Sequence, residues 1–309
     1  MIIDIVKLYL QSGKGGKGHF SMINLSALKS VDSGGNGGKG GDVILKISPH
    51  IYDLSKFRGN KQIIAKDGET GAKFNKQGKD AEPSIVFVPL GTRVIEKEKI
   101  ICDLTEKNDE FLICKGGFGG KGNYRRGYSL SAGEGVGKEV TFDYRIPADV
   151  AFLGFANSGK TSLFNSFTNK TYKVAEYPFT TSSCIWADSE YEFKIITVLD
   201  TPAFKRRKTS EQFIDNKFLK HIFRCKIIVL LSDDCSNCEQ DFEDLIKEIK
   251  IYDESLLKGK IILKLLTKVD KIGGKINNKD ILTISVNESQ TIEGLQKKLL
   301  ELLELNKNE

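Results

Sequence analysis

The sequence predicts two domains of different classes: a glycine-rich, mainly-β domain, then an α/β domain with a mostly parallel, doubly wound sheet. Three observations lead to this prediction. Of the 30 glycines, 24 lie before residue 149. The first 148 residues carry 23 Lys and Arg against 17 Asp and Glu, whereas the rest of the chain carries 24 of each. A phosphate-binding pattern, "GFANSGKTS" at 154–162, stands between an apolar run and a potential helix. We therefore place the domains at residues 1–148 and 149–309.

Length and composition describe a soluble globular protein with room for two cores: 309 residues, of which 39% are hydrophobic and 28% charged. No apolar run approaches the roughly 18–20 residues that a membrane helix needs. The N-terminus lacks the basic start and the small-residue cleavage site of a secretory signal. We therefore expect a cytoplasmic protein that does not insert into membranes.

The six cysteines are then expected to be reduced thiols. Cys235 and Cys238 form a C-x-x-C pattern, which raises the question of a metal or redox site. No second pair of Cys or His lies nearby at suitable spacing. We interpret the pattern as part of a loop that follows a strand.

Glycine runs in the first domain alternate with short apolar segments, which distinguishes them from a flexible linker. Closely spaced glycines allow extended, polyproline-like segments to pack side by side, because no Cβ keeps the backbones apart. We therefore predict a small core of strands from which packed glycine segments project. The glycine clusters occupy residues 12–18, 33–41, 68–80 and 115–138; the strand-like runs are the start of the chain and residues 42–48, 61–65, 84–95 and 110–116.

Lysines punctuate these clusters, and Tyr124, Arg125 and Arg126 adjoin one another in the last one. Positive charge beside backbone N–H groups suits a phosphate backbone, and an aromatic ring beside arginine suits stacking on unpaired bases. The same charges would also keep a glycine-rich surface solvated. The residues alone leave both interpretations open: RNA contact and plain solubility.

The second domain alternates apolar strands with helical patterns. Its strand-like runs are rich in Ile, Val and Leu, as expected of parallel strands that are buried on both faces. They occupy residues 150–154, 192–200, 226–234, 260–270 and 281–286, and helical patterns occupy residues 210–224, 238–257 and the C-terminal stretch marked by Ile292, Leu295, Leu299 and Leu302. In a sheet of this kind, ligands bind beyond the carboxyl ends of the strands.

The phosphate-binding pattern predicts a role for each of its main residues. Gly154 and Gly159 allow backbone N–H groups to converge on phosphate oxygens. Lys160 reaches the β- and γ-phosphates, and Thr161 offers its hydroxyl to Mg²⁺. Asp200 ends a later strand in "LDTPAF", where a carboxylate holds Mg²⁺ directly or through water. A threonine of "AEYPFTTSS" should reach Mg²⁺ and the γ-phosphate and so report which nucleotide is bound.

The segment "LTKVD" predicts which base the bound nucleotide carries. Asp270 is placed to accept from the N1–H and the exocyclic amino group of guanine, which adenine lacks in that arrangement, while the aliphatic stem of Lys268 lies over the base. Its order after the phosphate-binding loop favours GTP over ATP. "ISVNE" then follows a strand, and its backbone can contact the guanine O6.

Taken in order, several stretches resemble the Obg family of GTPases: "SGGNGGKGGDV", "KGGFGGKGN", "ADVAFLGFANSGKTSLFN", "KVAEYPFTT" and "NKFLKHIFRCKIIVLL". The resemblance covers essentially the whole chain. It implies a domain of glycine-rich polyproline II helices on a strand base, joined to a P-loop G domain. It also implies binding of GTP and GDP, slow GTP hydrolysis activated by K⁺ or the ribosome, and a role with the large ribosomal subunit and its rRNA in late assembly. We expect a monomer.

The resemblance also implies the functional residues. It makes Lys160, Thr181 and Asp200 catalytic and Thr161 and Thr181 ligands of Mg²⁺. The nucleotide would be bound by Gly154, Phe155, Ala156, Asn157, Ser158, Gly159, Lys160, Thr161, Phe179, Thr180, Thr181, Ser182, Ser183, Asp200, Thr201, Pro202, Ala203, Thr267, Lys268, Val269, Asp270, Ser285, Val286 and Asn287. Asn157 matches an asparagine that helps to hold K⁺ in related GTPases, and a structural hydrogen bond is the alternative for it.

The chain departs from the family pattern in its second switch. Ala203 stands where the family has a glycine whose N–H meets the γ-phosphate, and alanine restricts the backbone there. The following "FKRRKTSEQ" replaces a glycine-rich segment, so its four basic residues, Lys205 to Lys208, either contact rRNA or form a solvated loop. As in the family, no glutamine is available to orient the attacking water, and Phe204 occupies its place.

Two further departures concern binding. Thr267 replaces the usual asparagine, which predicts some loss of base affinity, and the basic segment after the first glycine run is here the less charged "FSMINLS". The leading hypothesis is a slow GTPase switch in large-subunit assembly. The second is a GTP- or GDP-binding scaffold or nucleotide sensor that does not hydrolyse GTP. The third is an organelle or stress-signalling GTPase without stable ribosome contact.

Overall fold

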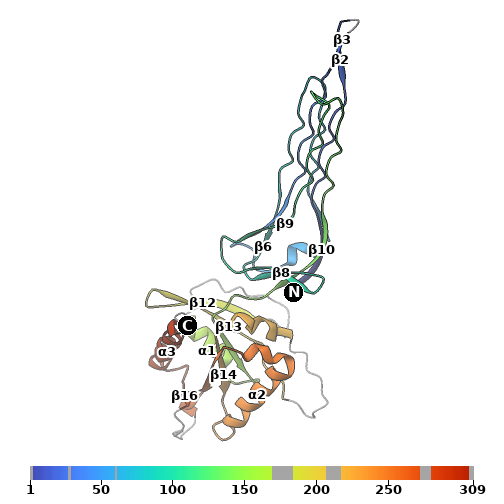
Figure 1. The fold of residues 1–309 in the computed structure, drawn as a ribbon. Coiled ribbons are helices and arrows are strands. Elements are labelled where there is room, and N and C mark those ends of the chain that lie inside the picture. Colours follow the sequence, from blue (N-terminus) through green and yellow to red (C-terminus); the bar gives the residue numbers. More distant parts are fainter. Residues whose placement is uncertain are drawn as a thin grey trace. The chain divides into compact units, whose positions relative to one another are not determined.

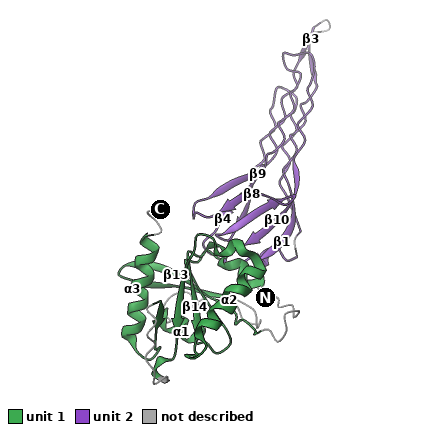
Figure 2. Cartoon of the chain, turned by 60° about the horizontal axis from the view of Figure 1, so that its bottom comes forward, with its two compact units in different colours: residues 1, 145–309 green, residues 2–144 purple. Residues whose placement is uncertain are grey.

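The computed structural model describes residues 3–26, 29–59, 61–168, 184–206, 217–271 and 280–305. The chain forms two compact units, one within residues 2–144 and the other within residues 145–309 (Figure 2). Within the described part of the chain, no helix combines the length and the apolar character that a bilayer crossing requires.

The first unit is built on two sheets whose strands alternate buried and exposed residues. The five-stranded sheet has the order β5 (Gln62–Ile64), β1 (Ile5–Gln11), β10 (Gly137–Tyr144), β7 (Thr92–Glu96), β8 (Lys99–Leu104). The three-stranded sheet has the order β6 (Ser84–Val88), β4 (Val43–Ile47), β9 (Glu110–Cys114), and a short 3-10 helix, η1, spans Ser55–Phe57. β1 pairs antiparallel with β10 along its full length, from Ile5 opposite Asp143 to Gln11 opposite Gly137.

The run at 84–95 appears as one strand in the sequence, and this prediction is wrong. The chain turns at residues 89–91, so that β6 and β7 join different sheets. Gly91 adopts a φ of 93°, which favours glycine, and the Thr92 hydroxyl donates to the Pro89 carbonyl at 2.7 Å. The turn therefore follows from local chemistry that the apolar pattern hides.

Extended glycine-rich segments run side by side beyond the sheets (Figure 1). Their backbone hydrogen bonds close triangles between three segments: Gly16 N–H donates to Gly38, Gly37 to Gly120, and Gly120 to Gly16, at 2.8–2.9 Å. A Cβ at Gly37 would overlap the carbonyl oxygen of Gly16. Glycine is required here because the backbones touch, as the sequence predicts for packed polyproline-like segments.

The far end of this unit holds a hairpin that the sequence analysis did not predict, β2 (Met22–Ser26) with β3 (Lys29–Asp32). Asn123 ties it to the glycine segments: its Oδ1 accepts from the N–H groups of Ser21 and Gly34, and its Nδ2 donates to Asp32. This side chain is fully buried. It therefore satisfies backbone donors that would otherwise lack partners.

The second unit contains a six-stranded sheet covered by helices, and its mostly parallel arrangement is as predicted. Its strand order is β12 (Ile185–Tyr191), β13 (Lys194–Asp200), β11 (Val150–Gly154), β14 (Ile227–Ser232), β15 (Ile261–Leu266), β16 (Ile281–Thr283). All neighbours are parallel except β12, an antiparallel edge strand that the sequence analysis did not predict. The helices are α1 (Lys160–Phe167), α2 (Cys238–Asp253) and α3 (Ser289–Leu305), with 3-10 helices η2 (Lys217–Arg224), η3 (Glu254–Leu257) and η4 (Val269–Lys271).

The core lies between the sheet and its helices. β14 is buried at all six positions, which explains its uninterrupted apolar sequence. Phe152 of β11 and Phe167 of α1 pack edge to face with ring centroids 5.9 Å apart. This packing places the end of β11 and the start of α1 on one rigid support. The helical pattern at 210–224 is present as the 3-10 helix η2 over its described residues, 217–224.

Candidate functional site

The loop between β11 and α1 is shaped by residues with left-handed backbone conformations. Gly159, which precedes α1, has a φ of 80°, and Asn157 has a φ of 66°. At Gly154, a Cβ would approach Ser158 Oγ to 2.5 Å and the carbonyl oxygen of Leu231 to 2.7 Å. The loop is therefore compact, and its N–H groups precede the positive end of α1, an arrangement that attracts phosphate.

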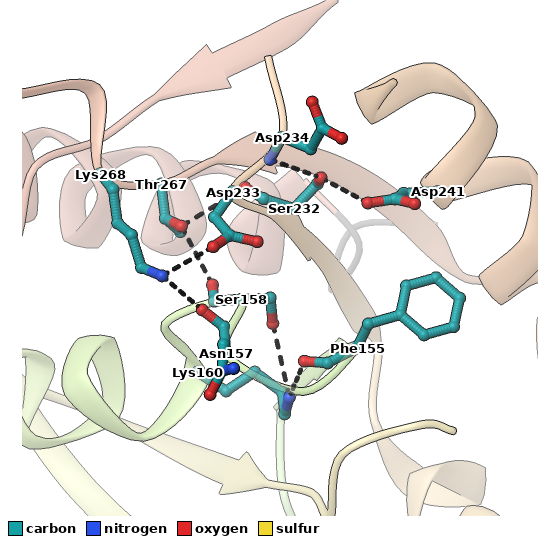
Figure 3. Close-up of polar contacts among 10 residues, drawn as sticks. All are labelled: Phe155, Asn157, Ser158, Lys160, Ser232, Asp233, Asp234, Asp241, Thr267 and Lys268. Atoms are coloured by element: carbon teal, nitrogen blue, oxygen red, sulfur yellow. Dashed lines mark hydrogen bonds and ion pairs between the residues drawn. The ribbon is translucent and has the colours of Figure 1, made fainter. Parts of the chain in front are cut away.

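Lys160 carries its ammonium into this loop (Figure 3). Its Nζ donates to the carbonyls of Gly154 and Phe155, both at 2.9 Å, and lies 3.4 Å from Ser158 Oγ. Burial lowers the pKa of Lys160, whereas the charges of Asp200 and Asp233 act to raise it. A cation is thus held at the centre of the loop, where a phosphate chain would need it.

Thr161 and Asp200 meet beside the loop. The Thr161 hydroxyl donates to Asp200 Oδ2 at 2.9 Å. Burial raises the pKa of Asp200 to about 6, while the hydrogen bond from Thr161 and the charge of Lys160 act in the opposite direction. Asp200 Oδ1 is buried and has no hydrogen-bond partner among the described atoms. A hard cation with oxygen ligands fits this pair of side chains.

A cleft of about 710 Å³ gathers most of the predicted phosphate-binding residues. It is lined by Ala156, Asn157, Ser158, Gly159, Lys160, Thr161, Ser162, Ile185, Asp200, Thr201, Pro202, Ala203 and Lys268. The sequence analysis missed Ser162 and Ile185. Ser162 is the last residue of the stretch at 154–162 and directly follows Thr161, which was a usable signal, whereas Ile185 belongs to the unpredicted strand β12. Thr201 is held by a hydrogen bond from its hydroxyl to the Phe152 carbonyl at 2.7 Å.

Lys268 crosses the loop from the other side (Figure 3). Its Nζ donates to the carbonyl of Asn157 at 2.6 Å and pairs with Asp233 Oδ2 at 2.7 Å. Its aliphatic stem therefore spans the space between the loop and the end of β14. The sequence analysis did not identify Asp233, although its place directly after a buried parallel strand was a signal.

Asp270 lies in η4, and two other predicted residues converge on it. Ser285 Oγ donates to Asp270 Oδ1 at 2.9 Å, and Asn287 Nδ2 donates to Asp270 Oδ2 at 3.1 Å. The carboxylate is exposed, so it is oriented by neighbours and still accessible to a ligand. Val286, between these neighbours, packs against the hydrophobic core. The two segments predicted to contact a base are thus joined.

Thr267 connects the segments that the sequence predicts to bind the base and the phosphates (Figure 3). It is fully buried, and its hydroxyl donates to the carbonyl of Ser158 at 3.0 Å and lies 3.3 Å from the carbonyl of Ser232. Ser232 Oγ in turn donates to Asp241 Oδ2 at 2.8 Å. A buried polar chain therefore runs from the loop to α2.

The segment after Ala203 is attached to the loop. Phe204 is buried, its N–H donates to the Gly154 carbonyl at 3.1 Å, and its ring packs on Phe218. Arg206 pairs with Asp241 Oδ1 at 2.7 Å, and its guanidinium lies 4.3 Å from the centre of the Phe155 ring. Arg206 is exposed, as expected of a solvated loop, but it is also fixed by these two contacts, and the rRNA contact stays a prediction. The neighbouring Lys205 is exposed.

Several predicted residues lie outside the described residues. They are Phe179, Thr180, Thr181, Ser182, Ser183, Arg207 and Lys208. Cys235 and Cys238 are described: Cys238 begins α2, and its Sγ lies 3.8 Å from the carbonyl of Cys235. In the described ranges, no group of three or more His, Cys, Asp and Glu is arranged to hold a metal ion.

Comparison with known families gives two matches. Residues 3–132 match the family described as GTP1/OBG, and residues 149–268 match the family described as 50S ribosome-binding GTPase. The chain is 34% identical over 286 residues to GTPase Obg of Chloroherpeton thalassium, and this match covers 88% of this chain and 85% of that protein. It is 35% identical over 317 residues to GTPase Obg of Amoebophilus asiaticus, and this match covers 96% of this chain and 94% of that protein.

Among solved structures, the cytosolic domain of the T. maritima FeoB iron transporter in its apo form is 26% identical, with a TM-score of 0.39. The likeness covers 50% of this chain and 63% of that one. The G domain of the same transporter is 23% identical, with a TM-score of 0.39, and this likeness covers 50% of this chain and 98% of that one.

Proposed function

Because the chain belongs to the Obg family of GTPases, which bind and hydrolyse GTP, we propose that it is a slow GTP switch that binds the large ribosomal subunit late in its assembly. The observation that carries the proposal is the convergence of three functions around one loop. Lys160 lies at its centre, Thr161 and Asp200 lie beside it, and the base-binding segment is bonded to it through Thr267. This arrangement suits a nucleotide that is held by its phosphates and its base together.

We propose Mg²⁺ as the cofactor, held by Thr161 and Thr181 with Asp200 close by. The buried Oδ1 of Asp200, which lacks a partner among the described atoms, supports this fit, and Thr181 lies outside the described residues. Mg²⁺ neutralises charge that develops on the β- and γ-phosphates when it is bound. The loop residue Asn157 is exposed at the cleft, where it would contribute to a K⁺ site.

The chain's own residues support binding more strongly than rapid cleavage. Lys160 would hold the β- and γ-phosphates, and the Asp270 carboxylate would accept from guanine. The backbone N–H of Ala203 would meet the γ-phosphate at the cleft. Phe204 is buried and carries no polar group, so it cannot orient the attacking water. Slow intrinsic hydrolysis is the expected result.

The glycine-rich unit supports rRNA as the partner. Residues 1–148, which contain this unit, carry the whole positive excess of the chain. Arg125 lies 5.1 Å from the centre of the half-buried Tyr124 ring, and Tyr128 and Phe74 are exposed. Cations and exposed aromatic rings on one domain suit a phosphate backbone with unpaired bases. We propose that the protein acts as a monomer in the cytoplasm.

A second candidate function is a guanine-nucleotide-binding scaffold or sensor that does not hydrolyse GTP. The attachment of Phe204 to Gly154, directly after Ala203, favours it, because a restrained second switch would respond less to the γ-phosphate. Binding would then be unchanged and only turnover would be absent.

The test is GTP turnover by the purified protein with Mg²⁺, in K⁺ and then in Na⁺, with and without large ribosomal subunits. Turnover that rises with subunits, together with GTP-dependent co-sedimentation, would support the switch. Lys160→Ala should bind neither nucleotide tightly and serves as the inactive control. Tight GTP binding without turnover in every condition would favour the scaffold. Turnover without co-sedimentation would exclude the ribosomal role.

A further inference from the structure

We propose that Arg206 is a positioning residue for GTP hydrolysis: paired with the buried Asp241 and stacked on Phe155, it holds Ala203 at the phosphate end of the cleft. This inference rests on the proposed GTPase function. Arg206 would not touch the nucleotide itself but would act by holding Ala203 in place. The inference concerns the segment that follows the second switch, where four basic residues come directly after Phe204.

Asp241 is a fixed point inside the protein. Its side chain is only 3% exposed, and it lies in the first turn of α2. One carboxylate oxygen accepts from Ser232 Oγ at 2.8 Å, and Ser232 itself is buried (Figure 3). A buried carboxylate without a cation is strongly unfavourable. Arg206 Nη2 lies 2.7 Å from Asp241 Oδ1, which has no hydrogen-bond partner among the described atoms, so the half-exposed guanidinium offsets this charge as an ion pair.

Arg206 joins this fixed point to the phosphate-binding loop. Its guanidinium pairs with Asp241 and at the same time lies over the ring of Phe155, the second residue of the loop. A planar guanidinium can form an ion pair through its edge and stack through its face, whereas an ammonium cannot do both equally well. The segment after the second switch is therefore attached to α2 and to the loop by one side chain.

Ala203 lies between restrained neighbours. On one side, the Thr201 hydroxyl donates to the Phe152 carbonyl at 2.7 Å. On the other, the Phe204 N–H donates to the Gly154 carbonyl at 3.1 Å, and Arg206 follows two residues later. Ala203 itself is exposed and lines the cleft. A glycine at this position would have a freer backbone. Ala203 is instead held at the cleft by the contacts of Thr201, Phe204 and Arg206.

The experiment compares Arg206→Ala, Arg206→Lys, Asp241→Asn and the double variant Arg206→Ala/Asp241→Asn with the wild-type protein. Lys205→Ala is the matched control, because Lys205 is the adjacent cation and is exposed. Intrinsic kcat and KM for GTP, GDP affinity, thermal midpoint and amide hydrogen exchange across residues 203–206 are measured for each. All assays use the full chain without ribosomal subunits.

We expect Arg206→Ala and Asp241→Asn each to lower kcat about tenfold, with KM and GDP affinity changed less than about threefold. Amide exchange across residues 203–206 should become faster in both variants. The double variant should be no slower than either single variant, because both changes break the same contact. Arg206→Lys should lie between Arg206→Ala and wild type, and Lys205→Ala should match wild type.

Unchanged kcat and exchange in Arg206→Ala would overturn the proposal. A rise in kcat would also overturn it, because Arg206 would then restrain the switch against turnover. Equal losses of kcat, GDP affinity and thermal midpoint would mean a general structural role. If the wild-type protein shows no turnover at all, the proposed hydrolysis fails, and the exchange rates then decide the anchoring role alone.

Discussion

The hydroxyl of Thr267 donates to the backbone carbonyl of Ser158 at 3.0 Å, across 109 residues of sequence. This bond joins the segment predicted to bind the base to the loop predicted to bind the phosphates. Ser158 is itself buried, and Gly159 stands against Thr267, where an added Cβ would lie 3.3 Å from Thr267 Oγ1. The two halves of the site are thus set at a fixed separation by one buried side chain.

Thr267→Val should weaken GDP binding and lower the free energy of unfolding by about 1 kcal/mol, the usual net value of one hydrogen bond. Valine matches threonine in shape and lacks only the hydroxyl. Thr267→Ser retains the hydroxyl and is the control for volume. GDP titration and urea unfolding measure both quantities. Equal affinities for the Val and Ser variants would show that the bond does not orient the site.

Asp270→Asn should reduce GDP affinity roughly 100-fold, because two charge-assisted hydrogen bonds to guanine are lost. An asparagine amide can instead donate to the carbonyl that xanthine carries in place of the exocyclic amino group. The variant should therefore bind xanthosine diphosphate more tightly than the wild type does. Competition titration with both nucleotides measures the change, and an unaltered preference for GDP would refute the assignment of Asp270.

Gly37→Ala should destabilise the glycine-rich unit by about 1–3 kcal/mol, since the new Cβ overlaps the Gly16 carbonyl in the packed segments. Gly59→Ala is the matched control, because a Cβ there meets no atom within 4 Å. Thermal unfolding followed by circular dichroism compares the two variants. GDP affinity should be unchanged in both. Identical unfolding of the two variants would contradict the packed arrangement of the glycine segments.

Cys225 should resist thiol reagents in the folded protein, while Cys235 reacts first. Cys225 is 1% exposed, and burial raises its pKa to about 12, with the charge of Lys260 acting to lower it. Between pH 9.0 and about 12 the unfolded chain would release this proton and the folded chain would keep it. This thiol therefore makes stability fall as pH rises through that range. Brief alkylation followed by peptide mass spectrometry gives the order of labelling, and early modification of Cys225 would contradict its burial.

Sequence reasoning succeeded where a structural element depends on neighbouring residues. The glycine and lysine of the loop, the strand before it and the helix after it are adjacent in the chain, so their pattern identifies them. The parallel strands were recognisable because burial on both faces demands apolar residues throughout, as in β14. The run at 84–95 failed because the same apolar pattern continues across a turn into another sheet.

Sequence by itself determined the two domain types, the loop around Lys160 and the candidate base-binding residue Asp270, because each depends on local spacing. Tertiary structure alone decided that Asp233 meets Lys268, that Thr267 meets Ser158 and that Arg206 meets Asp241. Partners of this kind are 35 to 109 residues apart and come from different elements of the fold. Their pairing depends on the order of the strands in the sheet. That order cannot be predicted from the residues adjacent to each side chain in sequence.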